Sequence, residues 1–182
     1  MQGLLQLSRL IDAVNATIGR AMSWLVLAAV IVSSVNASVR FAVSKSSNAW
    51  LELQWYLFGA VVLLGAAYTL QQNEHIRIDI ISSRLSARTR NWIDVIGHLL
   101  FLAPLCIVLL WLGVPFFMRA FTSGEISSSA GGLAVWPAKL LVPLGFALLL
   151  LQGISELIKR IAIMQGLIGD PHAGASSHDP VS

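Results

Sequence analysis

The sequence predicts an all-α membrane protein with four transmembrane helices, an N-terminal amphipathic helix in the membrane interface, and both termini in the cytoplasm. Of its 182 residues, 56% are hydrophobic and only 12% are charged, whereas soluble domains average roughly 45–50% apolar and about 25% charged residues. Four long stretches contain no Asp, Glu, Lys or Arg: residues 21–39, 53–73, 95–118 and 140–155. A membrane-spanning helix needs about 20 mostly apolar residues. The last stretch reaches this length when residues 133–138 join it across Lys139.

The first twenty residues have the spacing of an amphipathic helix. Apolar residues recur at intervals of three and four, at Leu4, Leu7, Ile11, Val14 and Ile18. The polar residues fall largely between them, at Gln6, Arg9, Asp12 and Asn15. This period predicts a helix over residues 1–20 that lies in the interface before the chain turns into the membrane near Arg20. The alternative is a signal peptide cleaved near Ala37, but the apolar stretch before it exceeds the usual length of roughly 7–15 residues.

The remaining elements follow in order along the chain. The spans are expected at about residues 21–43, 50–72, 92–118 and 134–157, and a flexible cytoplasmic tail at residues 161–182. Ser86 is a candidate N-cap for the third helix, which Pro104 and Pro115 are expected to bend. Residues 122–132, rich in serine and glycine, predict a flexible loop on the outer side.

The basic residues predict the orientation. If the N-terminus is cytoplasmic, the inner segments hold eight of the twelve Lys and Arg residues: Arg9, Arg20, Arg77, Arg84, Arg88, Arg90, Lys159 and Arg160. The outer segments hold the other four: Arg40, Lys45, Arg119 and Lys139. Short loops rich in Lys and Arg stay in the cytoplasm, so both termini are expected there. The net charge of +3 reflects this bias, and no nucleic-acid partner is expected.

Several function classes lack their motifs in this sequence. There is no Walker-type phosphate loop and no GxSxG, HExxH or GxGxxG motif. The single cysteine, Cys106, excludes an internal disulfide and a CxxC redox pair. The span centres carry no charged residue of the kind that marks an ion path. The nearest ones lie at span boundaries, where long side chains reach water: Arg40, Glu52, Lys139 and Glu156. Neither a catalytic residue, a cofactor nor a metal is expected, and the chain has the character of a supporting subunit.

Small residues form a stripe in the second span. Glu52, Gly59 and Ala66 are seven residues apart and therefore share one helical face, which continues to Asn73. In lipid, small residues mark the places where helices approach closely. The fourth span has a similar stripe, through Gly145, Gln152 and Glu156. The stripes indicate contact either within the chain's own bundle or with a partner.

His98 leaves an alternative open near the inner end of the third span. It is a candidate haem ligand or proton relay, which would make the chain a membrane oxidoreductase. Haem held between helices needs facing histidines, and no other span contains one. We therefore expect His98 to bond to a neighbouring helix.

The second span and the loop after it carry a more specific pattern. It consists of Trp50-Leu51-Glu52, then Trp55-Tyr56-Leu57-Phe58-Gly59-Ala60, then Glu74-His75-Ile76-Arg77-Ile78-Asp79. This pattern resembles the small permease subunit of the tripartite ATP-independent periplasmic (TRAP) transporters of bacteria, and the resemblance covers about residues 18–160. One departure is that Leu51 and Leu53 flank Glu52, where the family often has a second acidic residue.

The resemblance implies a non-catalytic subunit in the bacterial inner membrane. A large permease subunit would carry the solute and sodium sites, and a periplasmic solute-binding protein would deliver an organic acid or related small solute. This chain would scaffold the large subunit and help to dock the binding protein, with these two proteins and membrane lipids as its partners. Motif and stripe together give the candidate interface residues: Glu52, Trp55, Gly59, Ala66, His75, Arg77 and Asp79. A stand-alone homodimeric transporter is a further alternative.

Overall fold

The computed structural model describes residues 2–43, 48–72 and 86–169, and within these ranges the chain is almost entirely helical. The elements are α1 (Gln2–Val43), α2 (Asn48–Gln71), α4 (Ala87–Gly97), the π-helix η1 (His98–Leu102), α5 (Ala103–Ser123) and α6 (Trp136–Met164). Four stretches are long and apolar enough to cross a membrane: Gln2–Ala42, Asn48–Gln71, Arg88–Ser123 and Trp136–Met164. The prediction of four membrane-spanning helices is therefore confirmed.

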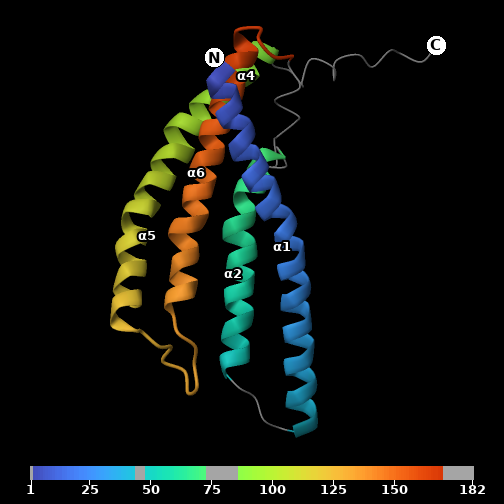
Figure 1. Cartoon of the computed structure of the whole chain (residues 1–182), viewed down its shortest axis with the longest axis vertical. Coiled ribbons are helices and arrows are strands. Elements are labelled where there is room, and N and C mark those ends of the chain that lie inside the picture. Colours follow the sequence, from blue (N-terminus) through green and yellow to red (C-terminus); the bar gives the residue numbers. More distant parts are fainter. Residues whose placement is uncertain (1, 44–47, 73–85, 170–182) are drawn as a thin grey trace, which may run out of the picture.

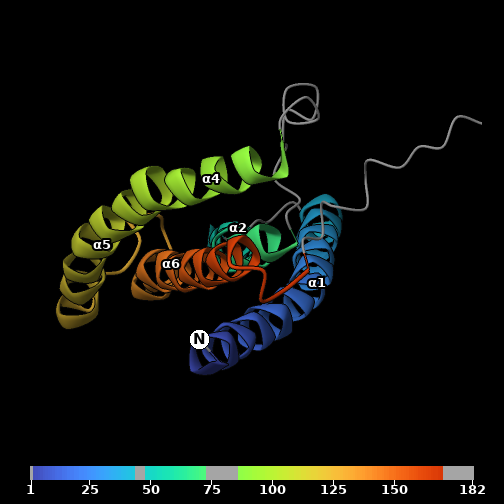
Figure 2. The same ribbon diagram turned by 90° about the horizontal axis from the view of Figure 1, so that it is seen from above.

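Helix α1 is longer than predicted because it has no break near Arg20. Its 42 residues form one continuous helix, which at 1.5 Å per residue is about 63 Å long. That is roughly twice the thickness of the hydrocarbon core of a bilayer, about 30 Å. The predicted amphipathic segment and first span therefore form one continuous helix, whose axis curves along its length (Figure 2). The placement of its first half in the interface stays a prediction.

The third membrane-spanning stretch consists of α4, η1 and α5 in direct succession. Ser86 caps it as predicted, since its hydroxyl oxygen accepts a hydrogen bond of 3.2 Å from the backbone N–H of Thr89. Figure 2 shows the axis of this stretch turning between α4 and α5.

The turn coincides with the π-helix, which ends at Leu102, two residues before Pro104. Proline has no N–H to donate to residue 100, and its ring would collide with that carbonyl in a regular helix. The helical turn instead contains one extra residue, so that the N–H of Ala103 bonds to the carbonyl of His98, five residues earlier. The predicted bend at Pro104 is therefore accounted for by a π-helical turn, whereas Pro115 lies inside the continuous α5.

Helix α6 is the centre of the bundle, because it contacts α1, α2, α4 and α5. In Figure 1 it lies between α5 and α2, and α1 follows α2 on the far side. The starts of α1 and α4 meet the end of α6 at one end of the bundle (Figure 1), which we call the N-terminal end. The connection between α5 and α6 lies at the opposite end, which we call the loop end. Helix α6 extends to Met164 and so includes residues 161–164, which were expected in the tail.

Glycines allow the closest helix contacts. A Cβ atom on Gly145 of α6 would lie 2.8 Å from the backbone oxygen of Leu63 in α2, a distance that no real side chain tolerates. A Cβ on Gly19 of α1 would lie 2.2 Å from the ring of Tyr68 in α2. Because lipid supplies no hydrophobic drive between helices, such contacts rely on close packing.

The small-residue stripe of α2 faces this chain's own helices where the structure describes it. A Cβ on Gly59 would meet Leu141 of α6 at 3.8 Å, and one on Gly65 would meet Met22 of α1 at 4.0 Å. Ala66 is half-buried. Gly59 thus packs against this chain's own α6, and contact of the stripe with a partner stays a prediction.

Candidate functional site

Two rows of polar side chains meet where the first half of α1 crosses the second half of α6. One row lies on α1, at Ser8, Asp12 and Asn15, and the other on α6, at Gln152, Ser155, Glu156 and Lys159. Positions three and four residues apart share one face of a helix, so each row forms a stripe, and the two stripes face each other. We call these seven residues the polar seam.

Gln152 is at the middle of the seam and is fully buried. Its side-chain oxygen accepts a 2.7 Å hydrogen bond from Asn15 Nδ2. Its Nε2 donates to Asp12 Oδ1 at 2.9 Å and to Glu156 Oε1 at 3.1 Å. The amide of Gln152 therefore connects Asn15 and Asp12 of α1 with Glu156 of α6.

Serine hydroxyls and a lysine complete the seam. Ser155 Oγ donates to Asp12 Oδ1 at 2.8 Å and lies 2.7 Å from Ser8 Oγ. Lys159 Nζ lies 3.1 Å from Asp12 Oδ2 and 2.5 Å from Glu156 Oε1. One ammonium group thus serves two carboxylates on two helices, and each carboxylate also accepts from Gln152.

Burial of the seam corrects one expectation. Glu156 was expected to reach water from a span boundary, but only 4% of its surface is exposed. Arg160, one turn further along α6, is 3% exposed. A buried charge is tolerated when it is paired and hydrogen-bonded, and both residues meet this condition through contacts with neighbouring residues.

A second polar contact fixes α4 to α6. Arg160 Nε lies 3.3 Å from Asp94 Oδ2, and its Nη1 donates to Asn91 Oδ1 at 3.2 Å. Asn91 is 3% exposed, so this contact is also enclosed by protein. Helix α6 is thereby joined by charged side chains to α1 on one side and to α4 on the other.

At the loop end, Glu52 holds the connection between α5 and α6. One carboxylate oxygen accepts a hydrogen bond from the hydroxyl of Ser127, and the other accepts a 2.7 Å bond from the backbone N–H of Leu133. A Cβ on Gly132 would lie 2.6 Å from Ser127 Cβ and 3.0 Å from Glu52 Oε1, so glycine allows the close packing of this loop beside the carboxylate. We call this contact the Glu52 clasp.

Further bonds keep the same connection in place. Asn48 Nδ2 donates to the carbonyl of Ala130, and the hydroxyl of Tyr56 donates to the carbonyl of Ala134, both at 3.2 Å. Lys139 pairs with Glu125 and lies 4.4 Å from the centre of the Phe116 ring. The loop, predicted to be flexible, is therefore tied to α2 by backbone and side-chain contacts.

His98 bonds within its own helical stretch, so the expected bond to a neighbouring helix is wrong for the described residues. Its Nδ1 lies 2.7 Å from the carbonyl oxygen of Asp94, and its Nε2 is buried without a hydrogen-bond partner. Haem ligation between helices would need a second, facing histidine. The other histidines, His75, His172 and His178, lie outside the described residues.

The other predicted interface residues have different positions. Trp55 is 73% exposed on α2, which suits either lipid or a partner. His75, Arg77 and Asp79 lie outside the described residues, so their roles stay predictions. Over the residues that are described, no group of three or more His, Cys, Asp or Glu side chains could hold a metal ion.

Sequence reasoning missed most of the seam. Asp12 and Asn15 were assigned to the polar face of an interfacial helix, and Ser8 and Lys159 to no site. The available signal was the matching length of two polar rows, one in residues 8–15 and one in residues 152–159. Amphipathic spacing alone did not indicate that the two rows face each other.

The geometry defines a multi-pass helical membrane protein in which buried polar groups tie helices and a loop together. Residues 29–162 match the family described as tripartite ATP-independent periplasmic transporters, DctQ component, and the chain belongs to this family. It is therefore a small membrane subunit of a TRAP transporter, a family of transporter components rather than enzymes, and it works with other TRAP components. No curated protein and no solved structure matches the chain.

Proposed function

We propose that this chain is a fixed, non-catalytic scaffold of a sodium-coupled TRAP transporter, which anchors the large permease subunit in the bacterial inner membrane. The observation that carries this proposal is the polar seam, in which α6 is bonded to α1 by buried amides and by the partly buried charges of Asp12 and Lys159. Sliding these helices past each other would break the bonds of Asp12 to Lys159, Gln152 and Ser155 and the bond between Asn15 and Gln152, and each buried polar group left unpaired costs about 1–3 kcal/mol. Such a bundle suits a subunit that stays still while its partner moves.

The Glu52 clasp supports a second part of the proposal. It holds the α5–α6 connection in a defined shape at the end of the bundle opposite the N-terminus. With the N-terminus in the cytoplasm, as the basic residues predict, this end faces the periplasm. We propose that the connection helps to dock the solute-binding protein there, for uptake of an organic acid or related small solute. Solute and sodium would bind to the large subunit.

Co-purification tests the scaffold directly. The chain should be expressed with the large permease subunit of the same transporter and purified in a mild detergent. A stable complex is expected, and uptake into liposomes should require both subunits, the binding protein and a sodium gradient. A chain that stays monodisperse and ignores the permease would contradict the proposal, as would uptake by liposomes that hold this chain alone.

The motif predicted after the second span gives a sharper test. Asp79→Ala or His75→Ala should reduce recovery of the complex several-fold, because these residues are proposed to order the contact with the large subunit. The matched controls, His172→Ala and His178→Ala, change histidines near the C-terminus and should leave recovery unchanged. Equal recovery of all four variants would show that the motif has no special role in assembly.

A further inference from the structure

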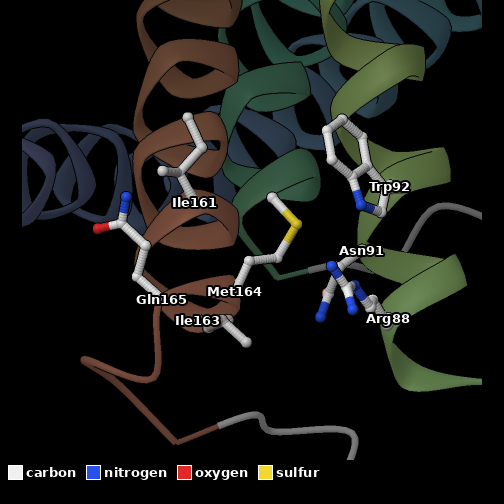
Figure 3. A pocket seen from close by; sticks show the side chains of 7 residues that line it. All are labelled: Arg88, Asn91, Trp92, Ile161, Ile163, Met164 and Gln165. Carbon is white, nitrogen blue, oxygen red and sulfur yellow. The ribbon is translucent and has the colours of Figure 1, made fainter.

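A pocket of about 540 Å³ lies between the start of α4 and the end of α6, at the N-terminal end of the bundle (Figure 3). Its lining residues are Arg88, Asn91, Trp92, Ile161, Ile163, Met164 and Gln165. Both helices belong to stretches long and apolar enough to cross a membrane, and the pocket lies at their ends. It is therefore expected at the depth of lipid headgroups.

Arg88 brings an unused positive charge to this pocket. Within the described parts of the chain, its guanidinium makes no hydrogen bond or ion pair. The basic side chains of nearby α6 differ in this respect, because Lys159 and Arg160 both pair with carboxylates. A guanidinium matches the geometry of a phosphate group and binds it through parallel N–H bonds.

The α4 wall of the pocket carries its positive charge, and the α6 wall is apolar apart from Gln165. Figure 3 shows Arg88 and Trp92 on the α4 side, with the indole nitrogen of Trp92 on the edge of its ring nearer Arg88. Met164 and Ile161 come from α6 and offer only apolar atoms apart from the methionine sulfur (Figure 3). Trp92 is half-exposed, so its N–H is open to a ligand. Hydrogen-bond donors that can bind a phosphate, placed beside an apolar wall, fit an amphiphile better than a free anion.

We propose that this pocket binds one anionic phospholipid. Arg88 and the indole N–H of Trp92 donate hydrogen bonds to its phosphate, and the first part of an acyl chain lies along Met164 and Ile161. Basic pockets between membrane helices are known to take lipid headgroups of this kind. The proposal needs only the membrane-spanning fold and does not rest on the scaffold function.

Native mass spectrometry of the purified full-length chain in detergent tests the site. The probes are phosphatidylglycerol and phosphatidylcholine with identical acyl chains, and inorganic phosphate alone. Both lipids offer the phosphate, but the choline ammonium of phosphatidylcholine cancels its negative charge beside Arg88, so we expect one phosphatidylglycerol molecule to bind at least about tenfold more tightly than phosphatidylcholine. Equal binding of the two lipids, or saturation of the site by inorganic phosphate at the same concentration, would overturn the proposal.

Variants locate the bound lipid. Arg88→Gln should lose the preference for phosphatidylglycerol, and Arg88→Lys should keep part of it. Arg119→Gln is the matched control, because it removes an exposed arginine from the other end of the same stretch. A preference that survives Arg88→Gln, or that Arg119→Gln abolishes equally, would refute this location. Should Arg88→Gln fail to fold, the Trp92→Leu variant, which keeps an apolar side chain without the N–H, gives the same comparison.

Discussion

The two ends of the bundle are held together in different ways. At the N-terminal end, the polar seam joins two helices mainly through contacts between side chains, and three of its members carry charge. At the loop end, one carboxylate holds a loop through a backbone N–H and a hydroxyl. The seam therefore sets how two membrane helices lie against each other, whereas the Glu52 clasp sets the shape of one connection.

This difference predicts different consequences of mutation. Loss of a seam residue leaves a buried charge or amide between helices, and the cost falls on the whole bundle. Loss of the clasp frees a partly exposed loop whose backbone can turn to water. Changes in the seam should therefore lower the stability of the whole bundle. Changes in the Glu52 clasp should make the α5–α6 connection more accessible to proteases.

The largest effect is expected from Lys159→Met. It leaves Asp12 and Glu156 without their shared cation, and the loss of one partner from a buried ion pair costs about 3–5 kcal/mol. The apparent melting temperature in detergent should fall by roughly 6–20 °C, at about 2–4 °C per kcal/mol for a chain of this size. Adding Glu156→Gln removes one of the two unpaired charges and should restore part of this loss. A double variant less stable than Lys159→Met would contradict the charge-based explanation.

An intermediate and local effect is expected from Glu52→Ala. The change removes both acceptors of the clasp and frees the N–H of Leu133 to bond to water instead. Limited proteolysis should cut the α5–α6 connection several-fold faster, while the melting temperature changes little. Glu125→Gln is the control, because it removes only the pair with Lys139, whose glutamate is half-exposed. Surface pairs contribute about 0–1 kcal/mol, so faster cutting of both variants alike would argue against a special role of Glu52.

The smallest effect is expected from Asn15→Ala. This variant loses one hydrogen bond to Gln152, and interhelical hydrogen bonds in membranes contribute about 0.6 kcal/mol on average. It also removes Asn15 Oδ1, a buried oxygen without a partner, which offsets part of the loss. The melting temperature should fall by no more than about 2 °C. A drop as large as that of Lys159→Met would show that the seam depends on amides rather than on charge.

The helices were predictable because their signals are local. Charge-free stretches fixed the four spans, the position of Ser86 marked a helix start, and Pro104 marked a bend. Gly145 was also recognised as part of a contact stripe, although its partner helix was not. Each of these inferences depends on residues within a few positions of one another.

The polar seam was not predictable in the same way, because it joins residues about 140 positions apart. The alternation of Asp12 and Asn15 with apolar residues shows that they share a face, but water and a second polar helix satisfy that face equally well. The clasp was missed for a related reason. Glu52 was identified as the acidic residue that opens the second span, but the sequence does not show which backbone group it accepts from.

The scaffold proposal requires that α1 and α6 keep their positions during transport, and a cross-link tests this most directly. Ser8 Oγ and Ser155 Oγ lie 2.7 Å apart, so cysteines at both positions, with Cys106→Ala to remove the native thiol, should form a disulfide on oxidation. The account predicts that the assembled transporter takes up solute equally well with this bond oxidised or reduced. Uptake that stops on oxidation and returns on reduction would show that these helices move, and would contradict it.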